Sequence, residues 1–164
     1  LLPAFHNVVL GTDGMGADML EEFKFAVFRH RESQGPWWPD DFLKALHRGN
    51  ELIGRYFAQD FTPFAHHVLQ SNYIQGTPDF PGFGTVKVGA PADLVLWDYD
   101  PPTPLSRDNI AGHLAYGWSS RSARTVVVAG ALRIVDHRPL YDDANIQALA
   151  REQALRLWKR MEER

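Results

Sequence analysis

The chain of 164 residues contains no cysteine. A disulfide framework and a thiolate metal site are both excluded by that absence. The formal charge of −3 lacks the basic excess of a nucleic-acid-binding surface, so we expect no nucleic-acid partner. No apolar run approaches the roughly 18 residues of a membrane span, so we expect no membrane partner. The composition, 45% hydrophobic and 23% charged, is typical of a globular protein, and we expect a cytoplasmic one.

The N-terminal segment lacks the features of a targeting sequence. Residues 1–7 carry no basic stretch, which a signal peptide would have. The chain also lacks an initiator methionine, so we expect it to begin partway into a protein.

An aspartate follows a short apolar segment near the N-terminus. Residues 8–10 read Val-Val-Leu, and apolar residues without alternation are typical of a strand buried on both faces. Asp13 comes next, in a loop rich in glycine. α/β barrels carry their chemistry at the carboxyl ends of such strands. A turn aspartate that binds a backbone N–H is the alternative. A phosphate loop is disfavoured, because no Lys-Ser/Thr pair follows.

Two helices are expected next. Asp18 and Glu21 form a D-x-x-E variant of the capping box, which predicts a helix that ends near residues 30–31. A second helix is expected from about residue 39, with apolar residues at helical spacing. Proline and glycine predict irregular structure over residues 60–84, apart from a helical turn or two around residues 64–69.

The second half is expected to be mostly β, followed by a closing helix. Residues 85–88 alternate, and residues 93–99 read as a strand. Residues 109–118 are ambiguous. The remaining signals are a hairpin, formed by residues 125–128 and 132–135, and a final helix capped by Asp142 or Asp143.

These elements predict an α/β fold that is not a complete barrel, since a (β/α)8 barrel takes roughly 250 residues. We expect the last strand and helices of a TIM-like barrel over residues 1–83. Part of a small composite β-sandwich domain follows over residues 84–141, and a C-terminal helix over residues 142–164.

Three segments, in this order, resemble the amidohydrolase superfamily over nearly the whole chain. Residues 10–14, Leu-Gly-Thr-Asp-Gly, resemble the end of the family's eighth barrel strand. Residues 88–95, Val-Gly-Ala-Pro-Ala-Asp-Leu-Val, resemble its G-x-x-A-D-L-V signature, and residues 126–131 resemble the hairpin that follows. Residues 102–105 (Pro-Thr-Pro-Leu) and the Asn109-x-x-Gly112-His113-Leu114 segment point to the chlorohydrolase/aminohydrolase branch, and within it to SsnA-like aminohydrolases.

The resemblance implies a metal-dependent hydrolase that cleaves a C–N bond. Its substrate would be a small nitrogen heterocycle, such as a purine, pyrimidine or triazine-like ring, which it would deaminate. Asp13 would be a metal ligand and would handle the proton of the metal-bound water. Zinc is the favoured divalent metal, with iron, manganese and nickel as alternatives. Met15 and Asp18 would bind substrate, although a helix cap explains Asp18 equally well.

The family's other metal ligands, all histidines, belong to barrel strands upstream of this segment. The seven histidines of the chain do not replace them, because His66 and His67 are adjacent and the others show no ligand spacing. We therefore expect the remainder of the barrel to come from upstream sequence or from a partner chain, and a homo-oligomer is a further expectation. The alternative function is that of a truncated or split homologue acting as a non-catalytic assembly or regulatory subunit.

Two other features have competing interpretations. Trp37 and Trp38 lie between two prolines and suit either a lid or the packing of a loop, with packing favoured. Asp93 is expected to be a structural hydrogen-bond acceptor at the start of a strand rather than a catalytic group.

Overall fold

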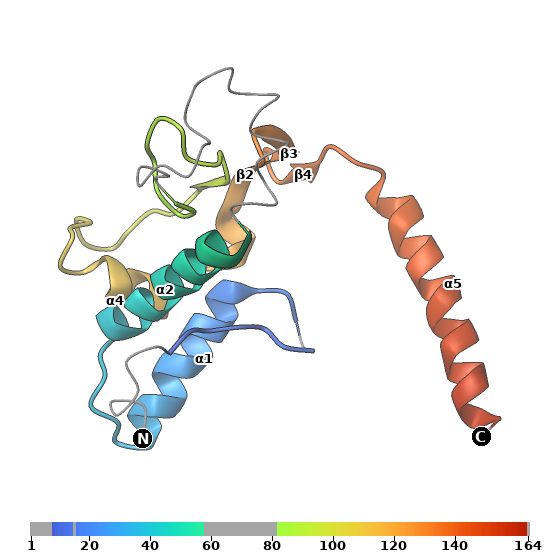
Figure 1. Cartoon of the computed structure of the whole chain (residues 1–164), viewed down its shortest axis with the longest axis horizontal. Helices are drawn as coiled ribbons and strands as arrows, with labels where there is room; N and C mark the ends of the chain where they lie inside the picture. The colour runs from blue at the N-terminus through green and yellow to red at the C-terminus, as the bar shows by residue number, and fades with distance from the viewer. Residues whose placement is uncertain (1–7, 15, 58–81, 164) are drawn as a thin grey trace.

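A computed structural model describes residues 8–14, 16–57 and 82–163, without the side chains of residues 55–57. Three helices, α1, α2 and α4, gather on one side, a small sheet lies beside them, and helix α5 stands apart (Figure 1). Of the helices within these ranges, none is both long and apolar enough to cross a membrane. The elements follow in the order α1 (Met19–Glu32), α2 (Pro39–Phe57), β1 (Leu94–Trp97), α4 (Ile110–Tyr116), the 3-10 helix η2 (Ser120–Ser122), β2 (Ala123–Val128), β3 (Ala131–Val135), β4 (Arg138–Pro139) and α5 (Asp143–Glu162).

Local signals set the ends of the first two helices, and the two predicted helices are confirmed. Asp18 caps α1 by accepting hydrogen bonds from the backbone N–H groups of Leu20 and Glu21. The carboxylate of Asp41 accepts from the Trp38 N–H at 3.0 Å at the start of α2, where proline at the first helical position costs no hydrogen bond. α1 ends at Glu32, slightly beyond the predicted residues 30–31.

The hydrophobic core lies where α1, α2 and α4 meet, and each of these helices contacts the other two. Phe23 and Val27 of α1 pack with Phe42 of α2 and Ala115 of α4. The small alanine side chains of α4 let its backbone approach the two longer helices closely. The fully buried apolar side chains are those of Phe23, Val27, Phe42, Ala45, Ala111 and Ala115.

The four strands form one antiparallel sheet in the order β1-β2-β3-β4. The predicted hairpin is confirmed as β2 and β3, which pair with Val128 opposite Ala131. Ala129 and Gly130 between them both have positive φ, 50° and 77°. Two such residues form the turn whose twist matches that of the strands it joins.

Two strand predictions are wrong and one ambiguous segment is resolved. Residues 8–10 and residues 85–88 are irregular, and β1 is shorter than the predicted residues 93–99. A strand needs a neighbour for its backbone hydrogen bonds, and none of the four described strands pairs with either segment. Residues 109–118 contain helix α4, inside the segment that was expected to be mostly β.

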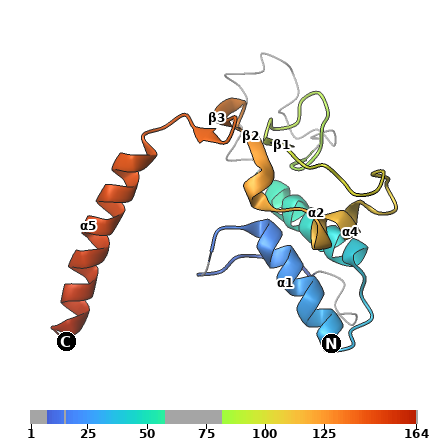
Figure 2. The same ribbon diagram turned by 180° about the vertical axis from the view of Figure 1, so that it is seen from behind.

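Helix α5 begins as predicted, with the Asp142 carboxylate accepting from the Asn145 N–H at 3.0 Å. None of its residues is buried, and Figures 1 and 2 both show it projecting away from the other elements. The apolar side chains that sequence periodicity assigns to one stripe are all largely exposed. They include Ile146, Leu157 and Met161.

The mixture of helices and antiparallel sheet agrees with the α/β class. The division into residues 1–83, 84–141 and 142–164 stays a prediction. Its first two parts are in contact, because α4 packs against both helices of the first.

Two phenylalanines on α1 test the placement of the core. Phe23 is 0% exposed and Phe25 is 68% exposed. Replacing Phe23 with alanine should lower the free energy of unfolding by about 3–5 kcal/mol, because the cavity is added to the lost transfer energy. Denaturant titration of the 164-residue chain measures this change. Phe25→Ala is the matched control and should change stability by no more than about 0.5 kcal/mol; equal losses would contradict the core described here.

Candidate functional site

Asp13 lies in an exposed loop whose upstream end is held by the helices. Leu10 packs against the hydrophobic core, and the Arg48 side chain on α2 donates from Nε to the carbonyl oxygen of Val8 at 3.0 Å. Asp13 itself has a φ of 53°, a left-handed conformation that aspartate tolerates better than most residues. Its carboxylate is therefore presented to solvent from a turn.

Asp18 holds the downstream end of the same loop. Its Oδ1 accepts from the N–H of Leu20 at 2.9 Å and of Glu21 at 3.1 Å. Partial burial raises the pKa of Asp18, but a hydrogen bond from the Ser120 side chain, the two backbone N–H groups and the charge of Lys24 together hold that pKa below its ordinary value. The structure thus gives Asp18 a capping role, while substrate binding by Asp18 stays a prediction. Met15 lies outside the described residues.

A complete metal centre is not built from the described residues, which contain no group of three or more His, Cys, Asp or Glu able to hold an ion. Asp13 brings one carboxylate, and His30 and His137 make their contacts elsewhere. His30 Nε2 accepts from the Trp37 N–H at 3.0 Å, and His137 Nε2 lies 3.1 Å from Asp98 Oδ2. The donor set near Asp13 therefore fits a single ligand of a divalent metal and not the whole site.

The aspartate of the G-x-x-A-D-L-V segment has a structural role, as predicted. Asp93 Oδ1 accepts from the Ala129 N–H at 2.7 Å, and the carbonyl oxygen of Ala92 accepts from the Gly130 N–H at 3.0 Å. Both bonds join the start of β1 to the turn between β2 and β3. The signature and the hairpin, which are separate in the sequence, are therefore one structural unit.

The proline-rich segment and the Asn109-x-x-Gly-His segment are also one unit. Asn109 donates from Nδ2 to the carbonyl oxygen of Pro104 at 2.9 Å and accepts from the Ser106 N–H at 2.8 Å. His113 Nε2 lies 3.0 Å from the Thr103 hydroxyl. These side chains hold the loop before α4 against the helix. The two sequence segments therefore correspond to one loop and the helix that it packs on.

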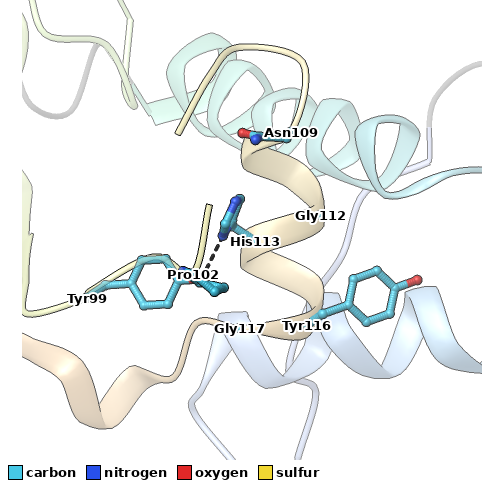
Figure 3. Close-up of a pocket in the computed structure, with 7 residues that line it drawn as sticks. All are labelled: Tyr99, Pro102, Asn109, Gly112, His113, Tyr116 and Gly117. Atoms are coloured by element: carbon cyan, nitrogen blue, oxygen red, sulfur yellow. Dashed lines mark hydrogen bonds between the residues drawn. The ribbon is translucent and has the colours of Figure 1, made fainter. Parts of the chain in front are cut away.

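A pocket of about 330 Å³ opens beside α4, and sequence reasoning missed it. In Figure 3, His113 points toward Tyr99, and the two side chains share a hydrogen bond of 2.7 Å between the Tyr99 hydroxyl and Nδ1. Both ring nitrogens of His113 and both ends of the Asn109 amide are thus engaged within the protein. The lining residues are Tyr99, Pro102, Asn109, Gly112, His113, Tyr116 and Gly117.

The two tryptophans between the prolines have different environments. Trp37 packs edge-on against Phe42, with ring centroids 5.2 Å apart, and lies against the core. Trp38 is largely exposed, with the Arg31 guanidinium 4.7 Å from its ring centre. The favoured interpretation, loop packing, is confirmed for Trp37.

The chain is similar to curated deaminases over nearly its whole length. It is 30% identical to a 5-methylthioadenosine/S-adenosylhomocysteine deaminase of Pelotomaculum thermopropionicum over 98% of the chain, and 29% identical to one of Dictyoglomus thermophilum over 94%. A 5'-deoxyadenosine deaminase of Methanoregula boonei is 27% identical over 98% of the chain. The alignments cover 33%, 32% and 32% of these relatives, so the chain spans about a third of their length.

These relatives are amidohydrolase-family enzymes, and the matches confirm the resemblance carried by the three segments. No family model matches the chain, and no solved structure matches it.

The cap at Asp18 predicts a specific dependence of stability on pH. Because the folded pKa is lowered from 3.8, the charged carboxylate stabilises the fold above its unfolded pKa, and that contribution is lost as pH falls through the folded pKa. Asp18→Ala should cost about 1 kcal/mol at neutral pH and progressively less in acid. Asp18→Asn is the control, since it keeps a capping oxygen that does not titrate. Denaturant titrations from pH 7 to about 3 measure both variants; a cost of Asp18→Ala that stays constant with pH would contradict this role.

Proposed function

We propose that this chain is the C-terminal part of a metal-dependent hydrolase that deaminates a nitrogen heterocycle, cleaving a C–N bond with activated water. The main support is the similarity of nearly the whole chain to curated enzymes that are named as deaminases. The position of Asp13, on a loop held at both ends and open to solvent, agrees with this function.

The proposed substrate class is an adenosine derivative altered at the 5' position. The relatives are named for 5-methylthioadenosine, S-adenosylhomocysteine and 5'-deoxyadenosine, which share the adenine ring and differ at the 5' end of the ribose. The reaction would replace the exocyclic amine of the ring with oxygen from water and release ammonia.

Asp13 is the residue of this chain that we assign to the chemistry. A bound divalent metal, zinc by preference and otherwise iron, manganese or nickel, would lower the pKa of a water molecule toward about 7. Asp13 would act as one ligand and would also accept a proton and pass it toward the departing amine. The other ligands would lie outside this chain, because the described residues near Asp13 do not complete the set.

The exposed apolar side chains of α1 support the proposal that another part of the protein packs against this helix. Phe28 contacts Tyr116 of α4, with ring centroids 5.7 Å apart, yet both side chains remain largely exposed. Phe25 on the same helix is more exposed still. Exposed aromatic surface of this kind usually marks an interface. We assign this one to the remainder of the barrel, supplied by upstream sequence or by a partner chain.

The same surface also favours a second candidate, a non-catalytic assembly or regulatory subunit. In that case the exposed face of α1 would bind a partner, and Asp13 would be only a turn residue. The two functions differ in what Asp13 does, so substitution of this residue separates them.

Asp13→Asn should abolish turnover of a 5'-modified adenosine in the complete enzyme, because the amide cannot accept a proton. We expect kcat to fall by a factor of about 10² or more. Ammonia release measures the rate, and circular dichroism checks the fold. Asp136→Asn is the matched control, since Asp136 is likewise exposed and has a positive φ of 46°. Near-normal turnover by Asp13→Asn would favour the assembly role.

The isolated 164-residue chain should not bind zinc or iron in a one-to-one ratio. A lone carboxylate is too weak a site to retain a metal through dialysis. Elemental analysis after dialysis measures the content, and the complete enzyme is the positive control. One tightly held metal per isolated chain would contradict the assignment of the other ligands to the rest of the barrel.

A further inference from the structure

The linker between α4 and β2 touches the beginning of α1. The Lys24 ammonium group on α1 donates a hydrogen bond to the carbonyl oxygen of Trp118, which lies 94 positions along the chain. The Ser120 side chain reaches the carboxylate of Asp18, which is the N-cap of α1. Two contacts therefore join residues 118–120 to the helix that follows the Asp13 loop.

The linker is itself held firmly. The Trp118 ring stacks on Tyr99, with centroids 4.5 Å apart and planes 20° from parallel, and meets Trp97 of β1 edge-on at 5.9 Å. Its backbone N–H donates to the carbonyl oxygen of His113 at 2.8 Å, and the Ser122 carbonyl oxygen accepts from the Asp98 N–H at 2.7 Å. The sheet and α4 thus fix the groups that touch Asp18 and Lys24.

The Asp13 loop depends on these contacts at one end only. Its upstream end is held by Leu10 in the core and by the bond from Arg48 to Val8. Its downstream end is Asp18, whose carboxylate binds the first turn of α1 and meets Ser120. A displacement of Asp18 would therefore shift the point at which the Asp13 loop joins α1.

We propose that Ser120 and Lys24 are positioning residues, which hold the Asp18 end of residues 11–17 so that the Asp13 carboxylate is correctly placed for catalysis. This inference rests on the proposed function, because it assumes that Asp13 acts in the reaction. Neither residue touches substrate. Each acts through α1 and the loop before it, and errors of about 1 Å in such placement can cost up to about 10² in rate.

The test uses the complete enzyme with two substitutions and two matched controls. Ser120→Ala removes the hydroxyl at Asp18, whereas Ser122→Ala removes a hydroxyl of the same 3-10 helix that donates to the carbonyl oxygen of Ser119. Lys24→Met removes the ammonium group at Trp118, whereas Lys44→Met removes one that pairs with Asp41 on the exposed side of α2. Kinetics of a 5'-modified adenosine give kcat and KM, and peptide-resolved hydrogen exchange follows residues 11–17.

Ser120→Ala and Lys24→Met should each lower kcat about tenfold with little change in KM, and should speed hydrogen exchange in residues 11–17. Both controls should leave kcat and exchange unchanged, and Ser120→Thr, which restores a hydroxyl, should recover most of the rate. Unchanged exchange in both variants, or equal effects of the controls, would overturn the proposal. Hydrogen exchange does not require turnover. It therefore still tests whether Ser120 and Lys24 hold the Asp18 end of the loop, even if Asp13→Asn proves active and the proposed function fails.

Discussion

The packing of α4 against α1 and α2 is the contact on which the arrangement of this chain depends. α4 is short, and Ala111 and Ala115 on its buried side are each only 1% exposed. Ala115 lies in the cluster with Phe23 and Phe42, so the second half of the chain is joined to the first through apolar burial. That burial places the linker after α4 beside the first turns of α1, where Lys24 and Asp18 meet it. The loop of Asp13 is thus linked to a sheet that begins about 80 residues later.

The residues that carry the family resemblance are different from the residue that we assign to catalysis. Asp93 joins β1 to the hairpin turn, and Asn109 and His113 fasten the proline-rich loop to α4. The side chains of all three form hydrogen bonds within the protein. Their contacts join segments that are separate in the sequence. Asp13, in contrast, makes a turn and presents its carboxylate to solvent.

The elements predicted correctly from sequence are those whose signals are local. The caps at Asp18 and Asp142 and the Ala129-Gly130 turn each involve residues a few positions apart, and all three are present. The strands expected at residues 8–10 and 85–88 fail because pairing is a property of the neighbour as well as of the segment. The segment that became α4 was ambiguous, since its helical character depends on the distant partners of Ala111 and Ala115.

The candidate site shows the same division. The position of Asp13 after an apolar segment could be recognised directly, as could the capping role of Asp18. The contact between Lys24 and Trp118 could not, because it joins residues 94 positions apart and uses a backbone carbonyl that leaves no trace in the sequence. The pocket beside α4 was missed for a similar reason: it depends on Tyr99 and His113 coming together across a proline-rich loop.

The barrel that we propose would account for two features of the described structure. Asp13 has too few ligands around it to hold a metal, and α1 and α5 have too little protein over their apolar side chains. A parallel barrel would supply both the additional ligands and the cover for the apolar side chains. Its strands are buried beneath helices, whose apolar faces they cover. The carboxyl ends of its strands carry polar groups on one rim. Residues 8–10 would then have partner strands, which the described strands do not provide. An exposed carboxylate at the end of that segment is the arrangement that a site completed from outside this chain requires.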